Sequence, residues 1–236
     1  MRLVALIAFL SLFSAGAVAD EKLTVVTDLW PPYVTQDGSK IGGPSTKIVR
    51  QVLDRSNIPY EIQLVPWARA YETALTKENV LIYNLVRTED RENRFKWVGE
   101  MHANDPTHIF GIGIYKQVPA DLNAAKKHMI AAVRNSMSAE ALQNHGFKVG
   151  VNIVLTEDDT SAIRLAEMGR TDFVATSQKT IEAYIGRFPF LDGSLEKGPN
   201  LLDSRLFLAA SKMTDNKIIN KLKTAFKAIS EESPTN

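Results

Sequence analysis

The 236-residue sequence contains no cysteine. Disulfide bonds, thiolate metal sites and cysteine nucleophiles are therefore excluded, and so is a lipid attached to an N-terminal cysteine. A folded chain without disulfides must be stabilised by buried apolar surface. A chain of this length is long enough to bury a sizeable core.

The sequence also lacks an excess of charge of either sign, with 28 basic and 27 acidic residues and a formal net charge of +1. This balance does not favour nucleic acid or an anionic membrane surface as a partner. The 4 histidines show no metal-ligand spacing, and no phosphate loop or Ser-His-Asp order is found. The sequence predicts neither a cofactor nor a bound metal.

A long apolar run is absent as well. The only candidate, Leu3 to Phe13, has about 11 residues, whereas a membrane span needs roughly 20. It follows Arg2 and precedes the small-x-small site Ala17-Val18-Ala19. This pattern is typical of a signal peptide at 1–19 that is cleaved after Ala19. We therefore expect export to a periplasm.

Apolar periodicity alternates between strand and helix along the remaining chain. Two consecutive α/β sets are joined by an extended, glycine-containing segment at 107–116. This order predicts an α/β fold with parallel strands, crossover helices and two lobes around a ligand cleft. The expected strands are 23–27, 60–66, 80–86, 129–133, 151–155, 172–176 and 206–211, and the expected helices are 45–56, 68–77, 121–127, 138–146, 160–169, 178–187 and 215–230.

Several short motifs occur together in a characteristic order. Thr88-x-x-Arg91 follows the third expected strand, and Trp97 comes six residues after the arginine. DLWPPY, GGPSTKIVRQVL, MGRTDFVAT and RLFLAASK lie at matching places before and after it. In this order the sequence resembles bacterial extracellular solute-binding proteins of family 3, the amino-acid-binder-like proteins. PWARAYETAL and LVRTEDRE resemble one branch of that family.

The resemblance implies a type II periplasmic-binding-protein fold, in which two lobes are joined by two crossing strands and close on a ligand. On the family pattern, lobe 1 comprises 20–112 and 205–236, and lobe 2 comprises 113–204. The resemblance further implies a monomer that binds a small molecule.

Arg91 is the first candidate binding residue. If Thr88 caps a helix, Arg91 lies in the first turn, where the helix dipole disfavours a cation. In the family the matching arginine holds a ligand carboxylate, which suits a planar guanidinium. The alternative is an ion pair within the chain, with Glu92 or Asp90.

Asn84 and Arg87 lie near the end of the same expected strand, and the carboxyl ends of strands face the cleft in open α/β sheets. For Arg87 the alternative is an ion pair at the strand end. Arg69 could reach the same cleft, or could be an exposed helical residue.

Four aromatic residues lie near expected strand ends, and the family commonly sandwiches its ligand between such rings. The alternative for each is packing within its own lobe. The four candidates are Trp30, Tyr33, Trp67 and Phe110.

In lobe 2, Asn135 and Ser136 take the place of the family's Gly-Thr/Ser turn, which meets the ligand carboxylate. Ser136 could equally cap the following helix, and the two roles are compatible. Ser177 occupies the position where amino-acid binders of the family carry an aspartate for the ligand's ammonium group. A hydroxyl cannot replace that counter-ion, so the resemblance leaves open whether an α-amino group is recognised.

The sequence thus predicts a non-enzymatic periplasmic solute-binding protein. Its expected ligand is a small polar or carboxylate-bearing, amino-acid-like solute captured by hinge closure for an ABC permease. One alternative is a stand-alone ligand sensor that acts on a membrane receptor. Another is an enzyme like the cyclohexadienyl dehydratases, which share the fold.

Overall fold

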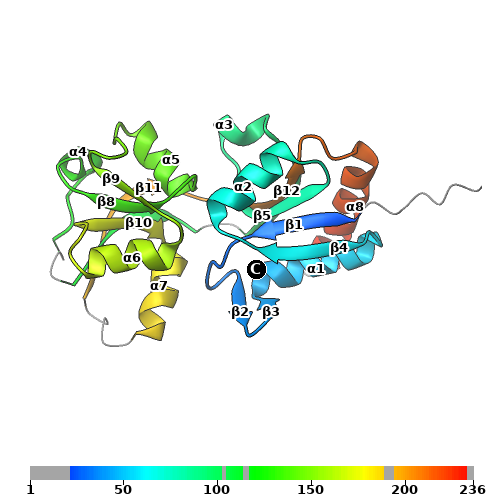
Figure 1. The fold of residues 1–236 in the computed structure, drawn as a ribbon, viewed down its shortest axis with the longest axis horizontal. Helices are drawn as coiled ribbons and strands as arrows, with labels where there is room; N and C mark the ends of the chain where they lie inside the picture. The colour runs from blue at the N-terminus through cyan, green and yellow to red at the C-terminus, as the bar shows by residue number, and fades with distance from the viewer. Residues whose placement is uncertain (1–21, 103–104, 114–116, 189–193, 233–236) are drawn as a thin grey trace, which may run out of the picture.

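The computed structural model describes residues 22–102, 105–113, 117–188 and 194–232. It has two lobes, each built on a five-stranded sheet with helices against both faces (Figure 1). The expected signal peptide at 1–19 lies outside the described residues, so its cleavage stays a prediction. Within the described ranges, no helix is both long and apolar enough to cross a membrane.

The lobe 1 sheet has the strand order β4-β1-β5-β12-β6. The first three of these strands are parallel, and β12 runs antiparallel to its neighbours β5 and β6. The strands are β1 (Leu23–Thr27), β4 (Tyr60–Leu64), β5 (Val80–Val86), β6 (Phe95–His102) and β12 (Leu206–Ser211). The other elements of this lobe are the hairpin β2 (Thr35–Asp37) and β3 (Lys40–Gly42), and helices α1 (Pro44–Ser56), α2 (Trp67–Thr76), α3 (Glu89–Glu92) and α8 (Asn216–Glu232).

The lobe 2 sheet has the strand order β11-β7-β10-β8-β9. Its strands are β7 (Thr107–Ile112), β8 (Ile130–Val133), β9 (Ile153–Thr156), β10 (Phe173–Ser177) and β11 (Leu195–Leu202). Its helices are α4 (Leu122–Ala125), α5 (Met137–Asn144), α6 (Asp159–Glu167) and α7 (Gln178–Arg187).

Apolar periodicity explains how the helices of lobe 1 pack. Helix α1 buries Val49, Val52 and Leu53 against the sheet, and α8 buries Ile219 and Leu222 in the same core. Each such side chain contributes roughly 1.5–3 kcal/mol when fully buried. The last helix therefore belongs to the core of lobe 1, although lobe 2 precedes it in the sequence.

The chain crosses between the lobes twice. The first crossing falls between His102, where β6 ends, and Thr107, where β7 begins, because β7 pairs only within the lobe 2 sheet. This corrects the predicted boundary after residue 112, which assigned the whole of β7 to lobe 1. The second crossing falls between Leu202 and Leu206, close to the predicted boundary at 204.

Gly43 fixes the loop that follows β1. Its φ angle is +95°, and a Cβ atom there would lie 2.4 Å from the carbonyl oxygen of Tyr33. Only glycine fits this close approach. The Ser45 amide donates to the same Tyr33 carbonyl at 3.1 Å, so the start of α1 holds this loop at the boundary between the lobes.

Candidate functional site

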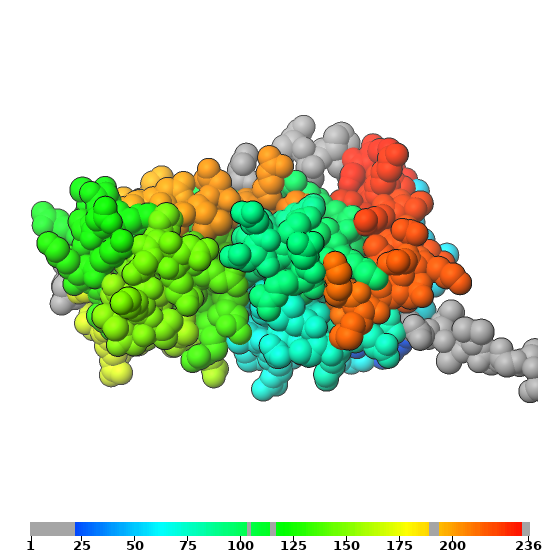
Figure 2. Space-filling model, turned by 90° about the horizontal axis from the view of Figure 1, so that it is seen from above, coloured from blue at the N-terminus to red at the C-terminus, as the bar shows by residue number. Residues whose placement is uncertain are grey.

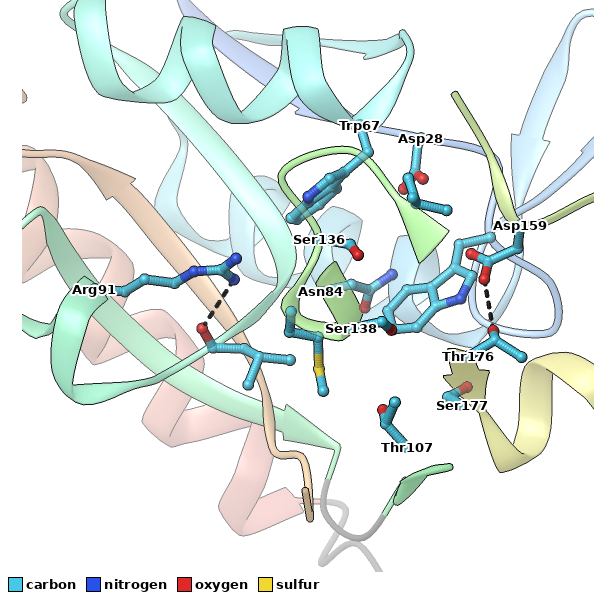
Figure 3. A pocket seen from close by; sticks show the side chains of 14 residues that line it. Asp28, Trp67, Asn84, Arg91, Thr107, Ser136, Ser138, Asp159, Thr176 and Ser177 are labelled. Carbon is cyan, nitrogen blue, oxygen red and sulfur yellow. Dashed lines mark hydrogen bonds between the residues drawn. The ribbon is translucent and has the colours of Figure 1, made fainter. Parts of the chain in front are cut away.

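A pocket with about 470 Å³ of empty space, part of which is open to solvent, lies between the lobes and is lined by side chains from both (Figure 3). We call it the inter-lobe pocket. Small-molecule sites commonly lie at such boundaries between domains. Lobe 1 contributes Asp28, Trp30, Trp67, Asn84, Val86 and Arg91, and lobe 2 contributes Thr107, Val133, Ser136, Met137, Ser138, Asp159, Thr176 and Ser177.

Asn84 combines an unusual backbone conformation with an unpartnered buried side chain. It lies inside the buried strand β5, yet its φ angle is +59°, a left-handed conformation that costs free energy in a strand. The residue is 2% exposed, and neither its amide nitrogen nor its amide oxygen has a hydrogen-bond partner among the described residues. Buried polar groups are normally paired, and this one lines the cavity (Figure 3).

Arg91 also lines the pocket but is engaged by lobe 2. Its Nη2 atom donates to Glu140 Oε1 at 2.7 Å and to the Asn135 carbonyl oxygen at 3.2 Å. The guanidinium carbon lies 4.9 Å from the centre of the Tyr71 ring, and the side chain is 1% exposed. The expected alternative partners were Glu92 and Asp90, but the ion pair is with Glu140 on α5. We call this part of the pocket the arginine end.

Asp28 and Asp159 lie away from Arg91, at the other end of the pocket, here called the carboxylate end (Figure 3). Burial raises the pKa of Asp28 to about 7, and the Asp159 carboxylate contributes to the rise. Burial also raises the pKa of Asp159 to about 6, although the hydrogen bond from Thr176 lowers it. Oδ1 of Asp28 has no hydrogen-bond partner within the described ranges.

Both tryptophans predicted to bind ligand line the pocket. The indole Nε1 of Trp67 donates to the Asn135 carbonyl oxygen at 2.9 Å, so this ring also bridges the lobes. The indole Nε1 of Trp30 is buried and has no hydrogen-bond partner in the described part of the chain. The lobes are in contact on the face seen in Figure 2.

The turn at Asn135 and Ser136 has the predicted geometry. Asn135 has a φ angle of +57°, as an asparagine in place of glycine can adopt. Its side chain does not line the pocket, and its carbonyl oxygen is the part that contacts lobe 1. Ser136 caps α5 by accepting from the Ala139 amide, and Ser177 caps α7 by accepting from the Thr180 amide; both also line the pocket.

The structure does not place the other four predicted residues in the lining of the inter-lobe pocket. Arg87 is paired with Glu92 through two hydrogen bonds, and its guanidinium carbon lies 5.2 Å from the centre of the Trp97 ring. This is the ion pair at the strand end that was the alternative to ligand binding. Arg69 is exposed on α2. Tyr33 is buried behind Trp30, and Phe110 lies in the core of lobe 2.

Sequence reasoning missed Asp28 and Asp159. Asp28 directly follows β1, and the rule that strand ends face the cleft could have found it, since that rule led to Asn84. Asp159 follows Asp158, which caps α6 by accepting from the Ser161 amide. Two neighbouring acids at a helix start look alike in sequence, and nothing local distinguishes the cap from the pocket residue.

The two lobes, two crossings and inter-lobe pocket define the fold of the periplasmic binding proteins, as predicted. The arginine-binding ArtJ from Geobacillus stearothermophilus, which also binds lysine and histidine, is similar at a TM-score of 0.78 and 17% identity, over 91% of each chain. The arginine-bound Gly52Ala mutant of ArgBP from T. maritima is also similar, with a TM-score of 0.75 and 16% identity over 88% of this chain and 95% of that one.

A third similar structure is a histidine kinase sensor domain with similarity to periplasmic binding proteins. Its TM-score is 0.77 and its identity 20%, over 90% of this chain and 91% of that one. No protein-family model and no curated protein matches the sequence. At these identities the likeness establishes the two-lobe fold, and the residues of the pocket must carry any statement about ligand.

Proposed function

We propose that this chain is a periplasmic solute-binding protein that holds a small polar solute in the inter-lobe pocket. The observation that carries the proposal is the Asn84 side chain, which is buried at the pocket with both amide atoms unpartnered. A buried amide without partners is costly, and a bound solute could satisfy it. Similar structures include an arginine-bound protein and a protein that binds arginine, lysine and histidine, which supports a small-solute role.

The mechanism we propose is hinge opening and closure about the two crossings. The Arg91–Glu140 ion pair and the Trp67–Asn135 hydrogen bond bridge the lobes, so a solute reaches the pocket when these contacts open. A solute that touches both lobes stabilises the closed arrangement by its higher affinity for that state.

A thermal-shift screen of the mature protein tests the proposal. The panel comprises amino acids, dicarboxylates, amines and short sugars, because a solute that binds only the folded state raises its apparent stability. We expect one class to raise the unfolding temperature. A panel in which every class leaves that temperature unchanged would contradict the proposal.

Asn84→Gly is the matched variant for that screen. Glycine accepts the positive φ angle without strain, so removal of the unpartnered amide should leave the free protein at least as stable. We expect the best solute to bind roughly tenfold more weakly to this variant, because its hydrogen bonds to the amide are lost. An unchanged affinity would place the solute elsewhere.

We propose delivery to an ABC importer as the role of the complex. A sensor domain among the similar structures supports the alternative of a receptor partner. Uptake of the identified solute by cells that lack this chain separates the two. Lost uptake supports the importer role, whereas normal uptake with a lost transcriptional or behavioural response supports the sensor.

One observation favours an enzyme as a second candidate. The pKa values of Asp28 and Asp159, about 7 and about 6, are in the range of general acids and bases. Mass spectrometry of a solute incubated with the protein decides between these functions. Recovery of the unchanged solute supports binding alone, and conversion, for example of a cyclohexadienyl acid, supports catalysis.

A further inference from the structure

We infer that the solute is an organic cation without a carboxylate group, bound with its charged nitrogen at the carboxylate end of the pocket. This inference rests on the proposed function, because it names the class of solute for the same site. An alkyl amine or a guanidine has the required chemistry. The two ends of the pocket differ in charge.

The arginine end has no net charge left for a ligand. The positive charge of Arg91 is matched by Glu140 at 2.7 Å, and the Asn135 carbonyl oxygen takes a further hydrogen bond from the same nitrogen. A ligand carboxylate placed there would lie near the negative charge of Glu140. It would have to displace an ion pair whose arginine is 1% exposed, which is unfavourable.

The carboxylate end, in contrast, has negative charge that is not compensated. Asp28 is 8% exposed, and its unpartnered Oδ1 atom and the Asp159 carboxylate line the same cavity. The contacts that the structure gives Asp159 include a hydrogen bond from Thr176 but no ion pair. Burial, together with neighbouring carboxylates, raises the pKa of both acids, so their charged forms are disfavoured in the free protein. Arg187, exposed at the end of α7, borders a neighbouring hollow with Asp159 and does not remove this imbalance.

The approach to this end is acidic too. A second hollow shares Asp28 with the pocket, and its remaining charged side chains are Glu157 and Asp158. Clefts lined by one sign of charge attract ligands of the opposite sign. At the pocket, Trp30 and Trp67 offer indole rings, whose faces attract organic cations. The unpaired Asn84 amide oxygen adds an acceptor for an N–H group.

Matched ligand pairs that differ only by the carboxylate test the inference. Isothermal titration of the mature protein at about pH 8, where both aspartates are ionised, would compare agmatine with arginine, cadaverine with lysine and histamine with histidine. We expect at least one amine to bind roughly tenfold or more tightly than its carboxylated parent. Equal or tighter binding of the parents would overturn the inference.

The panel of the proposed function separates the two possible failures. If a sugar, a dicarboxylate or a neutral amino acid binds in the pocket and no amine does, the inference is wrong and the solute-binding function stands. If no class of solute binds, both are wrong.

Charge variants locate the cation. Asp28→Asn and Asp159→Asn should each lower the affinity for the best-binding amine by roughly 10–100-fold, because each removes a counter-ion in a buried site. Asp37→Asn, on the exposed strand β2, removes the same charge outside the pocket and should leave the affinity unchanged. If all three variants weaken binding equally, the overall negative charge of the protein, and not a contact in the pocket, attracts the amine. That result would contradict the inference.

Glu140→Gln gives the converse test. It removes the counter-ion of Arg91 and keeps the shape of the side chain, so the arginine end gains a net positive charge. The preference for the amine over its carboxylated parent should then fall by roughly tenfold or more. A preference that does not change would show that Glu140 has no part in rejecting the carboxylate.

Discussion

The two ends of the inter-lobe pocket differ in how their charges are compensated. At the arginine end, Arg91 and Glu140 neutralise one another across the lobes. At the carboxylate end, Asp28 and Asp159 line one cavity with no ion pair in the part of the chain that the structure describes, and burial raises their pKa values. The arginine end therefore stabilises the contact between the lobes, whereas the carboxylate end destabilises the free protein and is suited to a ligand. A charged residue in a pocket is thus not by itself a ligand contact.

The largest effect on stability should come from breaking the arginine end. Glu140→Gln leaves the buried guanidinium of Arg91 without its counter-ion and should lower the free energy of unfolding by about 2 kcal/mol. Urea denaturation measures this. Glu92→Gln is the matched control, because it breaks an ion pair of the same type with Arg87 at the surface and should change the stability little. Similar losses in both variants would contradict the comparison.

At the carboxylate end, removal of a charge should change the stability in the opposite direction and stabilise the free protein. Because folding raises the pKa of Asp28 from 3.8 to about 7, the folded protein loses stability relative to the unfolded chain as pH rises between these values. Asp28→Asn removes this loss, so the variant should be more stable than the unsubstituted protein at about pH 8 and almost unchanged at about pH 4. Thermal unfolding at the two pH values checks it. Destabilisation at the higher pH would show that the Asp28 carboxylate is satisfied within the protein.

The smallest effect is expected outside the pocket. Arg87→Ala removes a guanidinium only four residues from Arg91, but this one is exposed, paired with Glu92 and in contact with the Trp97 ring. Affinity for the best solute should stay within about twofold of the unsubstituted protein. A loss comparable to that of Asp28→Asn would mean that the ligand reaches beyond the pocket described here.

Much of the fold is predictable because it rests on local patterns. The strands at 23–27, 80–86 and 206–211 and the helix at 178–187 occur with the predicted bounds. Among the strands that the sequence did not predict, β2 and β3 have only three residues each, and β6 and β11 depend on distant partners. β6 pairs with β12, which lies about a hundred residues later, and β11 contains Gly198 and Pro199 and pairs only with β7. Neither glycine nor proline favours a strand.

The candidate site divides in the same way. Asn84 could be predicted from its place near the end of a strand, and Ser136 and Ser177 from the resemblance to the family. The partner of Arg91 could not, because Glu140 is distant in sequence and approaches only when the lobes meet. Phe110 was wrongly expected at the cleft, since its side of β7 faces the helices of lobe 2. Which face of a strand points to the cleft depends on how the chain crosses between the lobes. The predicted first crossing, after residue 112, lies later in the sequence than the observed crossing between 102 and 107.

The most direct test of the difference between the two ends is a carboxyl-carbon NMR titration of the free protein, with Asp28→Asn and Asp159→Asn used for assignment. We expect Asp28 to titrate near pH 7 and Asp159 near pH 6, and both titrations to shift to lower pH when a tightly binding amine is added. Titration of both groups near the ordinary aspartate value of 3.8 in the free protein would contradict it.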